Sequence, residues 1–162
     1  MPSLGRSTQL LALALTICLA ACGKKREAGP EGDIVASLTA PTIDGPAFDP
    51  AKLRGKPGLV MFVSPTCPHC IDELTAAPKV ARDNDANAVA VFIVGKAENA
   101  KGVIEHTKFE GPVLIDDGTL KKKYGVRAVP YTVVVNAEGR ATEVLRGAVG
   151  ADRLADALDD AR

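Results

Sequence analysis

The hydrophobic positions of this chain fall into short continuous runs, separated by longer stretches in which apolar residues recur with a helical period. The runs at 59–63, 88–94 and 131–135 are rich in valine, as expected for β-strands that are covered on both faces. The other expected elements are a first short strand at 34–38, helices at 68–84, 98–109, 119–124 and 152–161, a strand fragment at 113–115 and a hairpin partner strand at 141–146.

The order of these elements predicts the class of fold. A strand–helix–strand unit comes first, which implies parallel strands joined by a right-handed crossover. The turn at 136–139 then joins an antiparallel pair, and a final helix follows. The sequence therefore predicts an α/β fold with a mixed central sheet, made of a parallel half and an antiparallel hairpin, with helices on both faces. A length of 162 residues suggests one such domain.

The N-terminal segment does not fit this fold and has the features of an export signal. Arg6 precedes an apolar run at 10–21 that is too short to span a bilayer, which needs about 20 residues. The run leads into Leu-Ala-Ala-Cys at 19–22, which resembles the bacterial lipoprotein signal, whose cysteine receives a diacylglyceryl group. We expect a signal peptide at 1–21, a flexible tether lipidated at Cys22 over 22–33 and a folded domain at 34–162. An ordinary secretory signal and an uncleaved anchor stay open.

Composition and cysteine usage exclude several classes of partner and of structure. The 20 basic and 20 acidic residues balance, so the charge does not indicate a nucleic acid or an acidic substrate. A hydrophobic content of 46% without tryptophan indicates an aliphatic core. Of the four cysteines, Cys18 leaves with the signal and Cys22 carries the lipid. Only Cys67 and Cys70 remain for the folded domain, which excludes a framework of structural disulfides.

Cys67 and Cys70 stand where a helix begins, directly after the apolar run at 59–63 and a turn. Pro68 suits the first helical position, where its missing N–H is not needed. The unpaired N–H groups and the dipole of a helix N-terminus favour an anion, so we expect Cys67 to have a lowered pKa and to be nucleophilic. Cys70 comes one turn later, within reach of a disulfide. The spacing predicts a redox-active dithiol.

The element order, with Cys-x-x-Cys opening the first helix and Val129-Pro130 before the hairpin, resembles the thioredoxin fold. More narrowly, the chain from about 36 to 161 is similar to the membrane-tethered TlpA/ResA-like branch of periplasmic thiol–disulfide oxidoreductases. The matching stretches are Leu53-Arg54-Gly55-Lys56, Cys67-Pro68-His69-Cys70, Asp116 within PVLID, Tyr124-Gly125-Val126, Val129-Pro130 and the turn at 136–139. The resemblance implies that Pro130 is cis and lies against the dithiol, and that Val129 pairs through its backbone with the substrate chain.

The chain also departs from the family pattern. Thr66 stands where family members usually carry tryptophan, and Met61 stands where thioredoxin has a buried aspartate, so the assisting acid is missing at that place. Pro68 and His69 form the pair found in the oxidant DsbA rather than the one found in thioredoxin. That pair implies that His69 stabilises the thiolate and raises the reduction potential, so both residues are expected to tune the dithiol.

These features predict an enzyme: a membrane-tethered, extracytoplasmic thiol–disulfide oxidoreductase, reducing or oxidising. It would exchange electrons with exported cysteine-containing proteins and with a thiol-redox partner, Cys67 reacting first and Cys70 resolving the mixed disulfide. We expect a monomer without cofactor or nucleic-acid partner, lipid-anchored on the periplasmic side of a bacterial membrane. Gly23 replaces the aspartate of an inner-membrane retention signal, which favours the outer membrane in a cell with two membranes.

Three other functions stay open. A Sco-like copper-handling module shares the fold, but it spaces its cysteines C-x-x-x-C and uses a distant histidine, for which only His106 is present. Zinc binding is not one of these three functions, because a zinc site would need two more ligands beside the cysteines, and we expect no metal. A peroxiredoxin-like antioxidant would match Ser64 but not Val60. The last alternative is a non-catalytic domain that holds peptides in the cleft beside Pro130.

Overall fold

The computed structural model describes residues 30–93 and 96–162 of the chain. The expected signal peptide at 1–21, the expected lipidation site Cys22 and most of the expected tether at 22–33 lie outside these residues. Within the described ranges, no helix combines the length and the hydropathy needed to cross a membrane.

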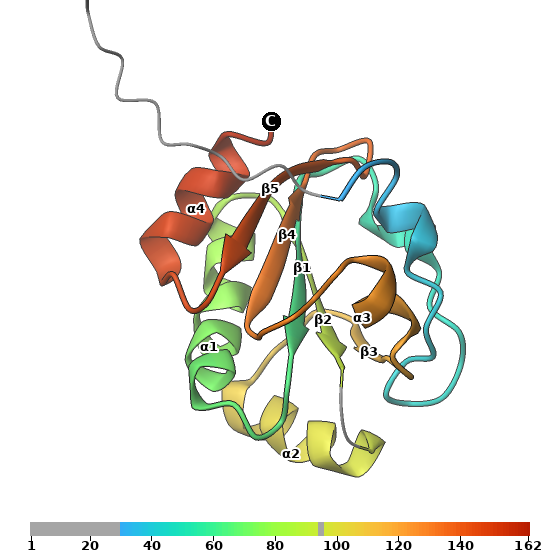
Figure 1. Ribbon diagram of the computed structural model, residues 1–162. Coiled ribbons are helices and arrows are strands. Elements are labelled where there is room, and N and C mark those ends of the chain that lie inside the picture. Colours follow the sequence, from blue (N-terminus) through green and yellow to red (C-terminus); the bar gives the residue numbers. More distant parts are fainter. Residues whose placement is uncertain (1–29, 94–95) are drawn as a thin grey trace, which may run out of the picture.

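A five-stranded sheet in the order β3-β2-β1-β4-β5 forms the centre of the fold (Figure 1). Its strands are β1 (Gly58–Val63), β2 (Asn87–Phe92), β3 (Val113–Ile115), β4 (Tyr131–Val135) and β5 (Ala141–Arg146). The helices are η1 (Val35–Ser37) and η2 (Pro50–Leu53), both 3-10, and α1 (Pro68–Asp83), α2 (Ala97–Thr107), α3 (Thr119–Lys123) and α4 (Ala151–Asp159). β1, β2 and β3 pair in parallel, whereas β4 pairs antiparallel with both β1 and β5. The predicted α/β fold with a mixed sheet is confirmed.

β1 lies in the middle of the sheet, and every one of its residues is buried. Its side chains alternate between two cores, because successive residues of a strand point to opposite faces. Leu59, Met61 and Val63 pack in the core shared with α1, α2 and α4, whereas Val60 and Phe62 pack with residues of η1, η2 and α3. Figure 1 shows α1 and α4 together on one side of the sheet and η1 and α3 on the other. Burial on both faces explains why β1 is a continuous apolar run in the sequence.

The segment expected as a first strand at 34–38 is instead the helix η1, so this prediction was wrong. Ile34, Val35 and Leu38 are all buried, and their spacing suits a helical turn, whereas a strand would direct neighbouring side chains to opposite faces. The N–H groups of Ile34 and Val35 both donate to the Gly139 carbonyl, at 2.8 and 3.3 Å. The β4–β5 turn therefore holds this segment without a strand ladder. The other expected elements are present, with ends shifted by up to two residues.

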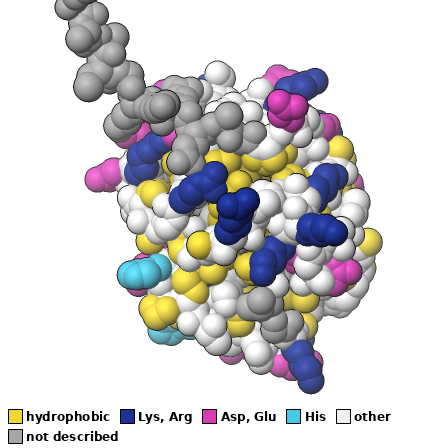
Figure 2. Space-filling view, viewed as in Figure 1, with side chains coloured by type: hydrophobic (Ala, Val, Ile, Leu, Met, Phe, Trp, Pro, Cys, Tyr) yellow, Lys and Arg dark blue, Asp and Glu magenta, His cyan; other side chains and the backbone are white. Residues whose placement is uncertain are grey.

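Basic side chains gather on one face of the molecule. Figure 2 shows lysine and arginine side chains over β4, β5 and α3, with acidic side chains mainly at the margin of this face. The exposed basic residues of α3, of the loop after it and of the end of β5 are Lys122, Lys123, Arg127 and Arg146. Because the whole chain has a net charge of zero, this concentration is a local feature of the fold.

Gly139 is the residue of the β4–β5 turn against which η1 packs. Its φ is 82°, and a Cβ atom at this position would lie 2.8 Å from Val35 Cβ and 3.0 Å from Asp33 Oδ1. We expect Gly139→Ala to lower the free energy of unfolding by about 2–4 kcal/mol, because backbone strain and steric overlap add. Denaturant unfolding of the purified domain measures this loss.

Gly55→Ala is the matched control for this prediction. Gly55 has a similar φ of 86°, but no atom lies within 4 Å of a Cβ built on it, so the variant carries the conformational cost alone. The Gly55 variant should therefore lose about 1–2 kcal/mol. Equal losses in the two variants would contradict the close packing of η1 on the turn.

Candidate active site

Cys67 is positioned by the end of β1 and the start of α1. After Val63, a tight turn forms in which the Cys67 N–H donates to the Ser64 carbonyl at 3.2 Å. Cys67 is the N-cap residue of α1, with φ and ψ of −102° and 108°, and Pro68 follows within the first turn of the helix. The sulfur occupies the place of the usual capping oxygen, since the Cys70 N–H donates to Cys67 Sγ at 3.2 Å. The structure thus places Cys67 at a helix N-terminus, as expected from the sequence.

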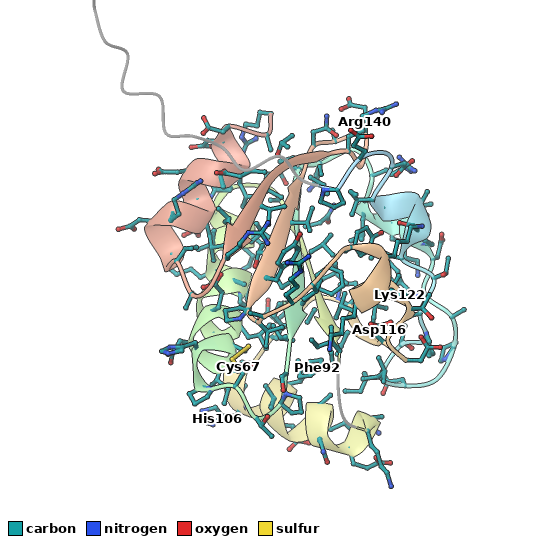
Figure 3. The ribbon with its side chains drawn as sticks, in the orientation of Figure 1. Cys67, Phe92, His106, Asp116, Lys122 and Arg140 are labelled. Atoms are coloured by element: carbon teal, nitrogen blue, oxygen red, sulfur yellow. A yellow bond between two sulfur atoms is a disulfide. The ribbon has the colours of Figure 1, made fainter. Side chains whose placement is uncertain are left out.

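The two cysteines form a disulfide, with their Cα atoms 5.2 Å apart. Cys70 is completely buried in the core beneath α1, while Cys67 is partly exposed and is followed by the exposed residues Pro68 and His69. Figure 3 shows the disulfide at the N-terminal end of α1. A sulfur nucleophile from another molecule therefore reaches Cys67 before Cys70, and access is one of the factors that decide which sulfur is attacked.

The loop before β4 meets this disulfide. The peptide bond between Val129 and Pro130 is cis, as the resemblance implied. The Val129 carbonyl oxygen lies 3.8 Å from Cys67 Sγ. On its other side the loop is held to the end of β5, because the Pro130 carbonyl accepts the Gly147 N–H at 2.9 Å. The structure therefore brings Cys67 and Cys70 next to Val129 and Pro130, although Cys67 and Val129 are 62 residues apart in the sequence.

His69 lies outside this cluster, in solvent. Its side chain is 77% exposed, and its Nδ1 atom is 4.0 Å from a carboxylate oxygen of Asp72. Water and salt weaken the electrostatic effect of a group so placed, so the tuning role of His69 stays a prediction. His106 is exposed on α2. Among residues 30–93 and 96–162, no group of three or more His, Cys, Asp or Glu side chains is placed to hold a metal ion.

Glu73 is a buried acid that sequence reasoning missed. It lies one turn after Cys70 on the inner face of α1 and is only 1% exposed. Its Oε2 atom accepts the Val149 N–H at 2.9 Å, whereas Oε1 has no partner among the described residues. Burial raises the pKa of Glu73 above its ordinary value of 4.5, and the N–H groups of Val149 and Gly150 act in the opposite direction.

Glu73 connects the two helices that lie beside the disulfide. Gly150 is the N-cap residue of α4, so a carboxyl group from α1 is directed at the start of α4. The spacing in the sequence could have revealed this residue, since a position three after Cys70 in a helix lies on the same face. Met61, at the position of the thioredoxin aspartate, is fully buried and apolar. Glu73, a buried acid on the helix that carries the two cysteines, thus belongs to α1 and not to β1.

The chain belongs to the family of thioredoxin-like domains, whose model matches residues 46–162. This match begins before η2 and includes the whole sheet, the disulfide and the cis-proline loop. The resemblance to thioredoxin-fold thiol–disulfide oxidoreductases is confirmed by the proteins to which the chain is similar.

The chain is 34% identical over 113 residues to the soluble secreted antigen MPT53 of Mycobacterium tuberculosis, covering 66% of this chain and 63% of that protein. It is 22% identical over 120 residues to the thiol-disulfide oxidoreductase ResA of Halalkalibacterium halodurans, covering 72% of this chain and 68% of that protein. A crystal structure of a secreted M. tuberculosis disulfide oxidoreductase, described as homologous to E. coli DsbE, superposes with a TM-score of 0.71. That structure is 28% identical in sequence and covers 80% of this chain and 99% of its own.

The raised pKa of Glu73 predicts a characteristic dependence of stability on pH. The folded protein retains the proton of Glu73 to a higher pH than the unfolded chain does, so this group makes the protein less stable as the pH rises through and above 4.5. Glutamine cannot ionise. We therefore expect the stability of Glu73→Gln relative to the wild type to increase between about pH 4 and pH 8, as measured by denaturant unfolding at several pH values.

Asp72→Asn is the matched control, because it removes a carboxylate from an exposed position next to Glu73 on α1. Its stability relative to the wild type should not follow the rise expected for Glu73→Gln. If the difference in free energy of unfolding between Glu73→Gln and the wild type stays constant over this range, the buried-acid interpretation is contradicted. The same holds if the variant becomes less stable relative to the wild type as the pH rises.

Proposed function

We propose that this protein is a thiol–disulfide oxidoreductase whose Cys67–Cys70 pair exchanges electrons with cysteines of exported proteins and with a thiol-redox partner. One observation carries the proposal: a partly exposed sulfur, Cys67 Sγ, caps the N-terminus of a helix and lies 3.8 Å from the Val129 carbonyl of the cis-proline loop. The membership in the thioredoxin-like family and the oxidoreductase names of relatives support it.

The reaction proceeds through a mixed disulfide. In the reducing direction, the Cys67 thiolate attacks one sulfur of a substrate disulfide, a new S–S bond forms, and the other substrate sulfur leaves as a thiolate. The Cys70 thiolate then attacks Cys67 Sγ, which restores the Cys67–Cys70 disulfide and releases the second substrate thiolate. Two electrons pass to the substrate, and its two sulfurs take up the protons that the cysteines gave to solvent. The reverse sequence oxidises a substrate dithiol.

The surroundings of the two sulfurs support different roles for them. The Cys70 N–H and the positive end of the α1 dipole both stabilise a thiolate at Cys67 over a thiol. Cys70 is completely buried among apolar side chains, and burial disfavours its charged form. The attacking thiolate of the reduced protein is therefore Cys67. Cys70 acts only when a mixed disulfide has formed beside it.

Val129 and Pro130 would hold the substrate chain. The Val129 carbonyl faces Cys67, and the Val129 side chain packs at the edge of the same core as Cys67 and Val149. An extended peptide that pairs with the backbone at Val129 would bring its own cysteine close to Cys67. Pro68 and His69 form the exposed rim of the dithiol, and we assign them the tuning of its reduction potential.

The N-terminal segment supports a location outside the cytoplasm. Residues 1–21 have the pattern of a signal peptide, Cys22 stands at the cleavage site, and 22–33 would link a lipid anchor to the domain at 34–162. The names of relatives include a secreted antigen and a secreted disulfide oxidoreductase. We propose a monomeric domain tethered to the periplasmic side of a bacterial membrane, with the outer membrane favoured by Gly23.

Cys70→Ser is the variant that tests the reaction. Without the resolving sulfur, the mixed disulfide at Cys67 persists, so this variant should accumulate adducts with other proteins. On non-reducing gels these adducts run as slower bands that disappear with dithiothreitol. Cys67→Ser is the control, because it keeps only the buried sulfur, and it should give at least about tenfold fewer adducts. Absence of adducts from Cys70→Ser, together with a Cys67 that resists alkylation at neutral pH, would overturn the proposal.

Cys22→Ser tests the proposed anchor. A diacylglyceryl group supplies two hydrocarbon chains, which is the number needed for stable attachment to a membrane. The wild type should incorporate labelled fatty acid and sediment with membranes, whereas Cys22→Ser should do neither. Cys18→Ser should behave like the wild type, because residue 18 is removed with the signal. A wild type that takes up no label, or a Cys22→Ser variant that still takes up label, would contradict lipidation at Cys22.

A further inference from the structure

An exposed basic surface lies next to the cis-proline loop. It consists of Lys122 and Lys123 at the end of α3 and Arg127 in the loop that follows, all three of them exposed. In Figure 2, lysine and arginine side chains gather on this face of the molecule. None of the three forms an ion pair with another residue that the structure describes. Positive charges that are not paired within the protein favour an anionic partner.

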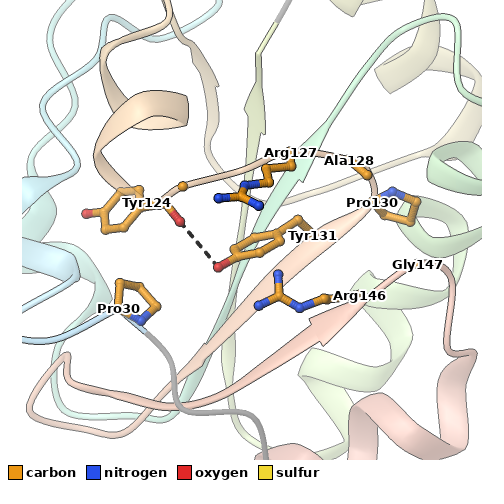
Figure 4. Close-up of a pocket in the computed structure, with 9 residues that line it drawn as sticks. Pro30, Tyr124, Arg127, Ala128, Pro130, Tyr131, Arg146 and Gly147 are labelled. Atoms are coloured by element: carbon orange, nitrogen blue, oxygen red, sulfur yellow. Dashed lines mark hydrogen bonds between the residues drawn. The ribbon is translucent and has the colours of Figure 1, made fainter.

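Pro30, the first residue that the structure describes, lies beside this basic surface. Pro30 and Arg127 line the same pocket, of about 590 Å³, at the start of β4 and the end of β5 (Figure 4). In this pocket Arg146 lies over the ring of Tyr131, with its Cζ atom 5.2 Å from the ring centre. The chain that precedes Pro30 therefore joins the domain on the side that carries the basic surface.

The length of chain between the proposed anchor and Pro30 limits how the domain can be turned on a membrane. The eight peptide units from Cys22 to Pro30 span at most about 28 Å, at about 3.5 Å each, whereas a compact domain of this size is about 35 Å across. A lipid at Cys22 would therefore hold the side of the domain that contains Pro30 close to the membrane. The basic surface lies on that side.

We propose that the basic surface binds the anionic phospholipid surface of the membrane to which the protein is tethered. The inference rests on the proposed function, in which Cys22 carries the lipid, and it adds an orientation of the domain on the membrane. Each lysine or arginine close to an anionic bilayer strengthens the attraction. Arg127 stands two residues before Val129, whose carbonyl lies 3.8 Å from Cys67 Sγ. The dithiol would therefore lie at the margin of the bound surface, where it can meet cysteines of proteins at the membrane.

The experiment measures binding to vesicles without any contribution from a lipid anchor. The chain expected after removal of the signal peptide, residues 22–162 with Cys22→Ser, is floated with vesicles of equal parts phosphatidylglycerol and phosphatidylcholine, or of phosphatidylcholine alone. At low salt, this parent chain should float with the anionic vesicles and not with the neutral ones, and high salt should abolish the difference. Lys122→Glu combined with Arg127→Glu should weaken binding to the anionic vesicles at least about tenfold, because two attractions become repulsions.

Lys79→Glu combined with Lys101→Glu is the matched control. Both lysines are exposed, and they belong to α1 and α2, which pack on the other side of the sheet from α3. The two double variants have the same net charge and keep the same basic tether residues at 24–26. The control should bind the anionic vesicles within about twofold of the parent chain. Thermal melts verify that both variants are folded.

Equal losses of binding in the two folded double variants would show that only the net charge matters, and would overturn the proposed role of the basic surface. So would a parent chain that binds both kinds of vesicle alike, or neither kind. The vesicle measurement involves neither the thiols nor a lipid, so these results would leave the oxidoreductase function and the anchor standing. Failure of those two proposals is seen instead in the adducts of Cys70→Ser and in the fatty-acid label of the wild type.

Discussion

The antiparallel pairing of β4 with β1 is the constraint on which the proposed chemistry depends. Its register places Phe62, near the end of β1, opposite Tyr131, the first residue of β4. The residues that follow β1 and the residues that precede β4 therefore emerge at the same edge of the sheet. This is why Cys67, at the start of α1, lies 3.8 Å from the carbonyl of Val129. With β4 parallel to β1, the loop and the disulfide would lie at opposite edges.

The burial of Glu73 on the helix that carries the disulfide has a cost in stability. Glu73 is buried one turn from Cys70, and one of its carboxyl oxygens has no partner among the described residues. A buried polar group without a full set of hydrogen bonds destabilises a protein. The other oxygen accepts the Val149 N–H beside the first turn of α4. One carboxyl group thus couples the helix that carries the dithiol to the helix that packs beside it.

The loop that ends in the cis-proline has apolar side chains toward the disulfide and charged and aromatic side chains around its other side. Toward the disulfide, Val129 packs against the same hydrophobic core as Cys67 and Val149, so this side of the loop is apolar. Toward the pocket, the same loop contributes Arg127 and is followed by Tyr131, which supports a second arginine.

The sequence by itself determined the strands, most of the helices and the dithiol, because strand burial, helical periodicity and the capping position of Cys67 are local properties of the chain. The pairing of Cys67 with Cys70 is equally local, since both lie in one turn of helix. The helical form of η1 and the hydrogen bond that joins Glu73 to the segment before α4 were decided only by the tertiary structure. Each depends on contacts between segments far apart in the chain, and neither local periodicity nor spacing contains the register that brings those segments together.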